Sequence, residues 1–260
     1  MCDKKTYLGI ELGSTRIKAV AIDEAYATAS SGDYTWKSSY VDGIWTYDLE
    51  EVWKGLKAAI SGVENRESVA AMGVSAMMHG YLAFDENWNL LVPFRTWQNT
   101  ITADAAAQLT EAFGFNIPQR WSIAHLYQAV LNGEEHVSKI RHITTLAGYV
   151  HYMLTGVNAL GIGEASGMFP IDSEKNCYNE EMLDKIEAML APQPKLKWKY
   201  SFSVYPSITN IWRVSFVPSF LLSAAYGTGQ PLSRLFFRFF FHSSKSYICP
   251  LPAYWFDTGA

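Results

Sequence analysis

The chain has 260 residues, enough for one large domain or two small ones, and a formal net charge of −4. Its cysteines, Cys2, Cys177 and Cys249, are isolated from one another, so neither a disulfide framework nor a zinc site is indicated. The first residues lack the apolar core of a secretory signal, and the uncharged run 214–233 is broken by prolines and glycines. These features favour a cytoplasmic protein without a membrane-spanning helix.

Charge and aromatic residues are divided unevenly along the chain. Residues 1–194 hold 24 acidic and 14 basic residues, whereas residues 195–260 hold seven basic residues and a single acid, Asp257. The second segment also carries 17 of the 38 aromatic residues. Such a change in composition indicates two segments of different character. We therefore take 1–194 as a folded domain and 195–260 as an atypical basic, aromatic-rich tail.

The first elements are two strands that form a hairpin over residues 8–23, around the polar turn 13–16 (Gly-Ser-Thr-Arg). The first strand alternates apolar with small or polar residues, and the second is nearly continuously apolar. A small-residue turn leaves backbone N–H groups open to an anion. Glu11, at the end of the first strand, is placed to hold a phosphate-bound Mg²⁺. An ordinary hairpin with a Gly-Ser turn is the alternative, and this stretch alone favours neither.

Strands and helices then follow one another along the chain. We predict further strands over 27–40, 69–78 and 81–84. We predict helices over 49–62, 103–113, 122–131, 134–140 and 179–190. The first helix has Asp48 as its N-cap and Glu51 at the capping-box position. The segment 143–154 fits a helix or a strand, and 161–169 is predicted to be a glycine-rich loop.

This pattern predicts an α/β domain in which a mixed sheet is flanked by helices. Ligands of such domains collect at the carboxyl ends of the strands. Glu11, Gly13 and His79 each stand at or just beyond a strand's end, so we expect them at one edge of the sheet.

A loop over 92–102 gathers further polar and aromatic side chains, including Trp97, Gln98 and Asn99. Each candidate has a structural alternative: His79 and Trp97 could be core residues, and Arg95 a structural ion-pair residue. The remaining histidines of this region fall on predicted helices or their ends without partners at metal-ligand spacing, and we interpret them as structural: His125, His136, His142 and His151.

Four stretches together resemble the FGGY carbohydrate kinases over residues 7 to about 190. The hairpin LGIELGSTRIKAVAID is similar to the family's first phosphate-binding motif, and VAAMGVSAMMHGYLAFDENWNLLVPFRTWQNT to its sugar-binding segment, in the version that xylulokinases carry. HITTLAGYVHYMLTG and the following Glu164-Ala165-Ser166-Gly167 resemble the stretch that ends in the family's Asp-Ala-Ser loop. The resemblance implies an actin-like, ribonuclease-H-like fold.

The resemblance also implies ATP-dependent phosphorylation of a sugar hydroxyl, a reaction that depends on positioning and charge neutralisation. Small-molecule sugar and ATP are then the partners, with no role for nucleic acid or membrane. Glu11 is implied as the Mg²⁺ ligand. The residues implied to hold the transferred phosphate are Gly13, Ser14, Thr15 and Lys18. Those implied to contact the sugar are Met78, His79, Trp97, Gln98 and Asn99.

Three departures from the family pattern stand out. Glu11 and Glu164 replace aspartates, which keeps the charge but moves it by about one C–C bond. The family's catalytic Asp, in a Gly-Asp motif, would lie beyond residue 195, and the tail contains no such motif. The catalytic base is therefore unassigned. The abrupt, aperiodic tail is what translation in a wrong reading frame would produce, and a divergent extension is the alternative.

Three functions follow for this chain. The first is an FGGY kinase acting on a ketopentose such as xylulose, here in truncated form. The second is a catalytically inactive remnant that binds sugar or phosphate. The third is an actin-like nucleotide-binding switch without kinase activity. The sugar-contacting residues that the resemblance implies, Met78, His79 and Trp97, argue against it, because a switch needs no sugar pocket.

Overall fold

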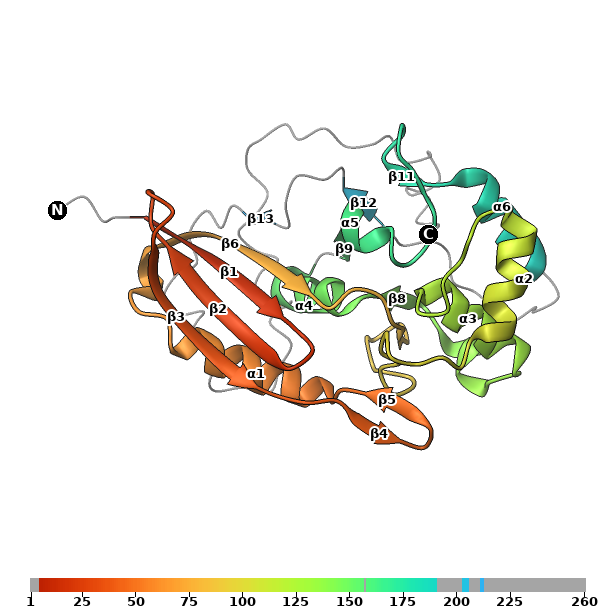
Figure 1. The fold of residues 1–260 in the computed structure, drawn as a ribbon, viewed down its shortest axis with the longest axis horizontal. Helices are drawn as coiled ribbons and strands as arrows, with labels where there is room; N and C mark the ends of the chain where they lie inside the picture. The colour runs from red at the N-terminus through yellow and green to blue at the C-terminus, as the bar shows by residue number, and fades with distance from the viewer. Residues whose placement is uncertain (1–4, 157, 191–202, 206–210, 213–260) are drawn as a thin grey trace, which may run out of the picture.

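The computed structural model describes residues 5–156, 158–190, 203–205 and 211–212 (Figure 1). Within the tail only two short strands are described, so the reading-frame hypothesis concerns residues that lie almost wholly outside the described part.

A five-stranded mixed sheet forms one end of the molecule (Figure 1). Its order is β13-β6-β1-β2-β3, with β1 and β6 parallel and the other neighbours antiparallel. The strands are β1 (Thr6–Leu12), β2 (Arg16–Ile22), β3 (Thr28–Thr35), β6 (Val69–Ala76) and β13 (Ile211–Trp212). Residues of β1 alternate between buried and exposed, as the period of two in the sequence predicted. The predicted α/β fold with a mixed sheet is confirmed.

Helix α1 (Leu49–Ser61) packs on one face of this sheet, against β2 and β3 (Figure 1). The approach is close: a Cβ on Gly32 of β3 would lie 2.2 Å from the carbonyl oxygen of Ala59. Asp48 is the N-cap, as predicted, and its Oδ1 accepts from the N–H of Glu50 at 2.8 Å. The capping-box role of Glu51 is wrong, because its carboxylate accepts instead from Tyr34 Oη and Lys54 Nζ.

The other end of the molecule is a second apolar core built mainly from helices (Figure 1). Its three principal helices agree with the predicted ones within one residue: α2 (Ala103–Phe113), α3 (Ser122–Leu131) and α6 (Glu180–Leu190). Between the two ends, β7 (Leu82–Phe84) pairs with β8 (His142–Thr144), and α4 (Leu146–Thr155) packs against β6.

Shorter elements connect these parts. They are β4 (Ser39–Val41), β5 (Ile44–Thr46), β9 (Ala159–Gly161), β10 (Ile171–Asp172), β11 (Cys177–Tyr178), β12 (Ser203–Tyr205), α5 (Ile162–Ala165) and the 3₁₀ helices η1 (Arg66–Ser68) and η2 (Glu135–Lys139).

Several predicted boundaries are corrected. The strand predicted over 27–40 ends at Thr35, because Trp36 turns away to bury its indole beneath the hairpin turn. The glycine-rich segment 161–169 is not all loop, since it contains the helical turn α5. The ambiguous segment 143–154 is mostly helix: β8 ends before Thr145, whose hydroxyl caps α4 by accepting from the N–H of Gly148. The predicted helix 134–140 is the 3₁₀ helix η2.

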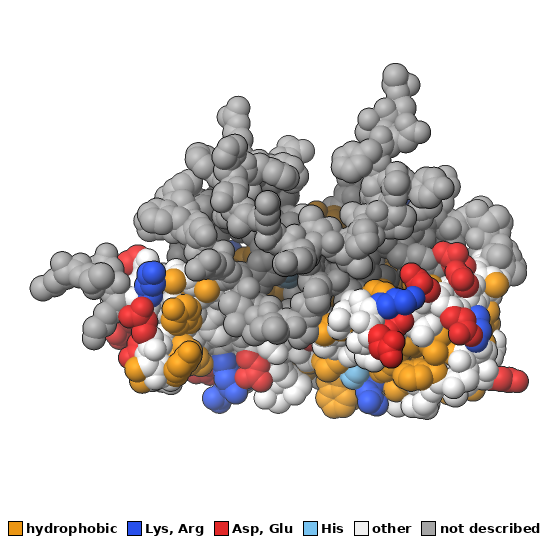
Figure 2. Space-filling view, turned by 90° about the horizontal axis from the view of Figure 1, so that it is seen from above, with side chains coloured by type: hydrophobic (Ala, Val, Ile, Leu, Met, Phe, Trp, Pro, Cys, Tyr) orange, Lys and Arg blue, Asp and Glu red, His pale blue; other side chains and the backbone are white. Residues whose placement is uncertain are grey.

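The described surface carries mixed charge. Figure 2 shows acidic and basic side chains interspersed with apolar ones on both flanks of this face. Over the part of the chain that the structure describes, no helix has the length and hydropathy needed to cross a membrane.

Candidate functional site

The hairpin turn and the Met78–His79 segment come together because their strands are parallel neighbours. In the register of β1 with β6, Leu12 lies opposite Ala76, and the N–H of Met77 donates to the carbonyl of Leu12 at 2.9 Å. Both strands therefore end at the same level, and the turn and His79 follow directly. The predicted meeting of these two segments at one edge of the sheet is confirmed.

The turn itself offers two N–H groups, not three. The N–H of Gly13 donates to the carbonyl of Arg16 at 3.0 Å, which closes the hairpin and removes this donor from any ligand. The N–H groups of Ser14 and Thr15 have no acceptor among the described residues, and both residues are exposed. Two adjacent outward donors of this kind suit a phosphate oxygen.

Two aromatic side chains hold the turn from beneath. Trp36 Nε1 donates to the carbonyl of Gly13 at 2.7 Å, and Tyr47 Oη donates to the carbonyl of Ser14 at 2.6 Å. Their rings lie 4.4 Å apart and are buried, and burial raises the pKa of Tyr47. With the carbonyls held inward, the N–H groups face out. Sequence reasoning missed both residues, because they lie more than 20 residues beyond the turn in the chain.

Glu11 and Lys18 are cross-strand partners on β1 and β2. Lys18 Nζ lies 3.2 Å from Glu11 Oε2, and about half of each side chain is exposed. Such an exposed pair contributes little to stability and separates readily. Glu11 is thus a carboxylate beside the turn, and the nearby Asp33, opposite Lys18 on β3, is paired with Arg16 at 3.4 Å. One carboxylate suits a Mg²⁺ that arrives on a nucleotide and keeps its waters, but not an ion held by protein alone.

His79 has a left-handed backbone, with φ of +68°. Its Nδ1 lies 3.3 Å from the carbonyl oxygen of Gly167, and burial lowers the pKa of its imidazole. A Cβ on Gly167 would lie 2.6 Å from this nitrogen and 3.0 Å from Cε of Met78. Met78 is exposed. The segment that resembled the Asp-Ala-Ser loop therefore packs against the predicted sugar-contacting pair.

The three residues of the Trp97 loop differ in availability. Trp97 is 43% exposed, so its ring is free to contact a ligand. Asn99 is buried, and its amide donates to the carbonyl of Trp45 and accepts from the N–H of the same residue, both at 2.8 Å. That pairing ties the β4–β5 hairpin to the loop and leaves Asn99 a structural role. Gln98 has a buried Oε1 without a partner among the described residues.

The buried Arg95 forms an ion pair with the partly buried Glu134, as its structural alternative predicted. The four histidines interpreted as structural are all buried or half-buried. Within the described ranges no three His, Cys, Asp or Glu side chains cluster as a metal site.

Glu164 is buried in α5, three residues before Gly167. Its carboxyl is hydrogen-bonded to Thr145, and its Oε2 has no partner among the described residues. Burial raises the pKa of Glu164 to about 7, against the smaller opposing effect of Thr145. This residue is therefore a proton-binding group near neutral pH.

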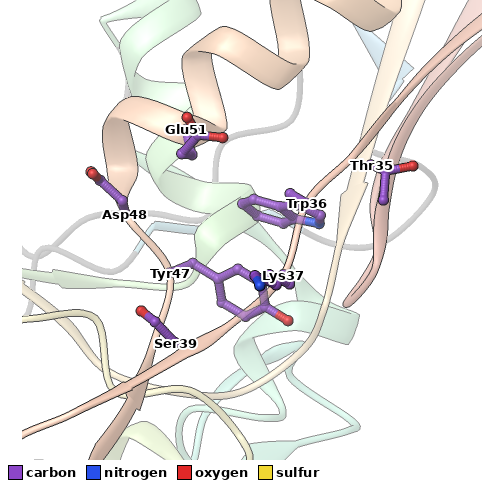
Figure 3. Close-up of a pocket in the computed structure, with 7 residues that line it drawn as sticks. All are labelled: Thr35, Trp36, Lys37, Ser39, Tyr47, Asp48 and Glu51. Carbon is purple, nitrogen blue, oxygen red and sulfur yellow. The ribbon is translucent and has the colours of Figure 1, made fainter.

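A cavity of about 440 Å³ opens on the outer side of Trp36 and Tyr47 (Figure 3). It is lined by Thr35, Trp36, Lys37, Ser39, Tyr47, Asp48 and Glu51. Sequence reasoning did not predict it. Neither Ser14 nor Thr15 lines it, so the cavity adjoins the aromatic support of the turn but is separate from the outward N–H groups.

Comparison with known proteins gives a consistent result. Residues 6–199 match the model of the FGGY family of carbohydrate kinases, N-terminal domain. A xylulose kinase from Lactococcus lactis is 25% identical over 204 residues, which span 72% of this chain and 40% of that protein. One from Escherichia coli is 20% identical, over 82% of this chain and 46% of that protein.

Among solved structures, xylulose kinase from Bifidobacterium adolescentis aligns with a TM-score of 0.64 at 16% identity, covering 77% of this chain and 47% of that one. This likeness concerns the fold. The chain spans about 40 to 47% of the length of these three relatives.

Proposed function

Because this chain belongs to the FGGY family of carbohydrate kinases, we propose that it is the sugar- and phosphate-binding lobe of an ATP-dependent kinase whose substrate is a ketopentose such as xylulose. The observation that carries the proposal is that β1 and β6 end at the same level. This brings the turn 13–16, called the phosphate turn below, beside Met78 and His79. A phosphate donor and a sugar hydroxyl must meet in this way for phosphoryl transfer.

Each residue has a role in this proposal. The N–H groups of Ser14 and Thr15 hold phosphate oxygens, and Lys18 supplies positive charge once it leaves Glu11. Glu11 holds the Mg²⁺ of the nucleotide, which would neutralise phosphate charge. His79 hydrogen-bonds sugar hydroxyls, Met78 and Trp97 contact the apolar C–H face, and Gln98 supplies a polar contact. Gly13 shapes the turn, and Asn99 supports the loop.

The catalytic base stays unassigned, since no acidic residue of the described site stands in the family's Gly-Asp motif. We therefore expect this chain to bind sugar and nucleotide without efficient turnover. A general base contributes typically 10²–10⁴-fold to such a reaction.

Calorimetric titration of the purified chain with xylulose, glycerol and gluconate tests the proposal, with and without Mg²⁺-ATP, alongside an ATP-consumption assay. We expect saturable binding of xylulose that His79→Asn weakens about tenfold, the loss of one or two hydrogen bonds. Asparagine tolerates the left-handed backbone of His79. His142→Asn is the matched control, because His142 is equally half-buried but stacks on Trp88 away from the site.

The outcomes distinguish a working kinase, a sugar-binding chain without turnover and a nucleotide-binding switch. Sugar-dependent ATP turnover would show a working kinase and defeat the inactive remnant. Sugar binding without turnover supports the proposed lobe or remnant. Nucleotide binding that no sugar affects would favour the actin-like switch and contradict the proposal.

A further inference from the structure

We propose that the side chains of Tyr81, Arg95 and His136, which are buried, and of Glu134, which is partly buried, form a positioning network that sets the Met78–His79 segment against the Trp97 loop. The inference rests on the proposed function in one respect: it takes these two segments as the sugar-binding ones. The residues of the network are positioning residues and do not themselves contact sugar.

The network begins at a backbone bridge between the two segments. The N–H of Tyr81 donates to the carbonyl of Arg95 at 2.8 Å, and the N–H of Arg95 donates back to Tyr81 at 3.2 Å. His79 stands two residues before one end of this bridge, and Trp97 two residues after the other. The bridge is therefore the nearest fixed point that the two candidate sugar segments share.

The side chains of the same two residues close a ring of contacts. The guanidinium of Arg95 donates to both carboxylate oxygens of Glu134. Glu134 Oε2 lies 3.4 Å from Nδ1 of His136, whose Nε2 lies 2.9 Å from Tyr81 Oη. The Arg95 guanidinium also lies over the Tyr81 ring, 5.4 Å from its centroid. A His136 that carries its proton on Nδ1 satisfies every contact, by donating to Glu134 and accepting from Tyr81.

Burial makes these contacts costly to break. Tyr81 is fully buried, Arg95 is 4% exposed and His136 is 6% exposed, while the Glu134 side chain is 24% exposed. Burial alone would raise the pKa of Glu134, but the hydrogen bonds and charge of Arg95 hold it below its usual value. A buried charge that loses its partner is strongly unfavourable, so the network resists partial opening. Glu134 is the N-cap of η2 and His136 lies within it, next to Val137 of the helical core, so the network ties the bridge to the edge of that core.

The link to His79 is short and stiff. Gly80 has φ of +90°, and a Cβ on it would lie 2.7 Å from the carbonyl oxygen of Arg95 and 2.8 Å from the ring of Phe94. Its carbonyl accepts from Ser122 Oγ at 2.5 Å, and its N–H donates to the carbonyl oxygen of Arg120 at 3.0 Å. Because the backbone at Gly80 is tightly packed, a displacement of the Tyr81–Arg95 bridge also displaces His79.

The test uses Tyr81→Phe, which removes one hydroxyl from the network and leaves the ring in place. Tyr127→Phe is the matched control: Tyr127 is also buried in the helical core, and its Oη donates to Gln108 at 3.2 Å, away from the bridge. Two quantities are measured on the full chain, residue-resolved amide hydrogen exchange and the Kd for xylulose. Glu134→Gln, which keeps the shape but not the charge, is the second variant.

We expect Tyr81→Phe to raise exchange about tenfold at residues 78–81 and 94–98, the equivalent of one lost hydrogen bond, and to raise the Kd by several-fold. Glu134→Gln should act in the same direction and more strongly. Tyr127→Phe should change neither the amide exchange of these segments nor the Kd for xylulose. Exchange that rises uniformly over the chain, or not at all in these segments, would overturn the positioning role.

The two proposals fail separately. If the wild-type chain binds no sugar but exchange still rises selectively in both segments, the positioning of these segments stands and the proposed sugar site is wrong. If xylulose binds and the exchange response is selective but the Kd does not move, the network is structural and the inference is overturned.

Discussion

The imidazole of His79 lies directly against the backbone of Gly167, with its Nδ1 3.3 Å from the Gly167 carbonyl oxygen. Glycine is required here by space, since a Cβ would lie 2.6 Å from that nitrogen. Residues 88 positions apart in the sequence are thereby held in contact, and the orientation of His79 depends on a segment that contributes no side chain at that point.

Gly167→Ala should displace His79 and Met78 and so weaken xylulose binding. Overpacking of this kind costs about 1–3 kcal/mol, so we expect a tenfold or greater rise in Kd, measured calorimetrically, and a lower urea midpoint. Gly163→Ala is the control, because a Cβ there meets nothing within 4 Å. Equal sugar affinity in the two variants would contradict the contact between His79 and the Gly167 segment as a determinant of binding.

Trp36→Phe should loosen the phosphate turn by removing the hydrogen bond to the carbonyl of Gly13. The expected loss in the free energy of unfolding is about 1 kcal/mol. Nucleotide affinity should fall as well, because the Gly13 carbonyl is no longer held inward. Trp53→Phe removes a comparable bond, to Tyr149 Oη at 3.2 Å, on the far side of α1 and should leave nucleotide affinity unchanged. A fall in both variants would mean that the effect is global.

Glu164→Gln should stabilise the protein above neutral pH. Burial raises the pKa of Glu164 from 4.5 to about 7, so between these values the folded state binds the extra proton and stability declines as pH rises. At pH 8 the buried charge costs about 3 kcal/mol, which glutamine avoids. Urea unfolding should show the variant more stable at pH 8 and the difference vanishing near pH 5.

The exposed Glu187 on α6 provides the comparison for that measurement. Glu187→Gln should leave the pH profile of stability unaltered. A Glu164→Gln advantage that is the same at pH 5 and pH 8 would mean that the substitution acts through packing and not through the buried charge.

His125→Leu should make the fold less sensitive to acid. His125 is fully buried and both of its ring nitrogens lack a partner among the described residues. Burial lowers its pKa from 6.5 to about 3, so stability is present above pH 6.5 and declines as pH falls toward 3. At pH 5 the wild-type chain should have lost about 2 kcal/mol through this residue, and the leucine variant should retain it. Identical pH dependence of the urea midpoint in both proteins would refute this assignment.

Local sequence was sufficient for the α/β fold, the hairpin over 8–23, the helices α2 and α3 and the pairing of the turn with His79 at one edge of the sheet. These depend on short-range periodicity, on caps such as Asp48 and on stop residues such as Gly114, all of which are read from neighbouring positions. The motifs in their order likewise led to the family that the match over residues 6–199 shows.

Tertiary structure decided which atoms of the candidate site are available. Asn99 uses its side-chain amide to bind the backbone of Trp45, 54 residues away, a contact that no local pattern specifies. Trp36, Tyr47 and Gly167 act on the site through hydrogen bonds and steric contact with residues far away in the sequence. Sequence alone therefore determined that the turn and the His79 segment meet at one edge of the sheet. Only the folded chain, in which buried polar groups must find partners, determined which of their donors and acceptors face outward.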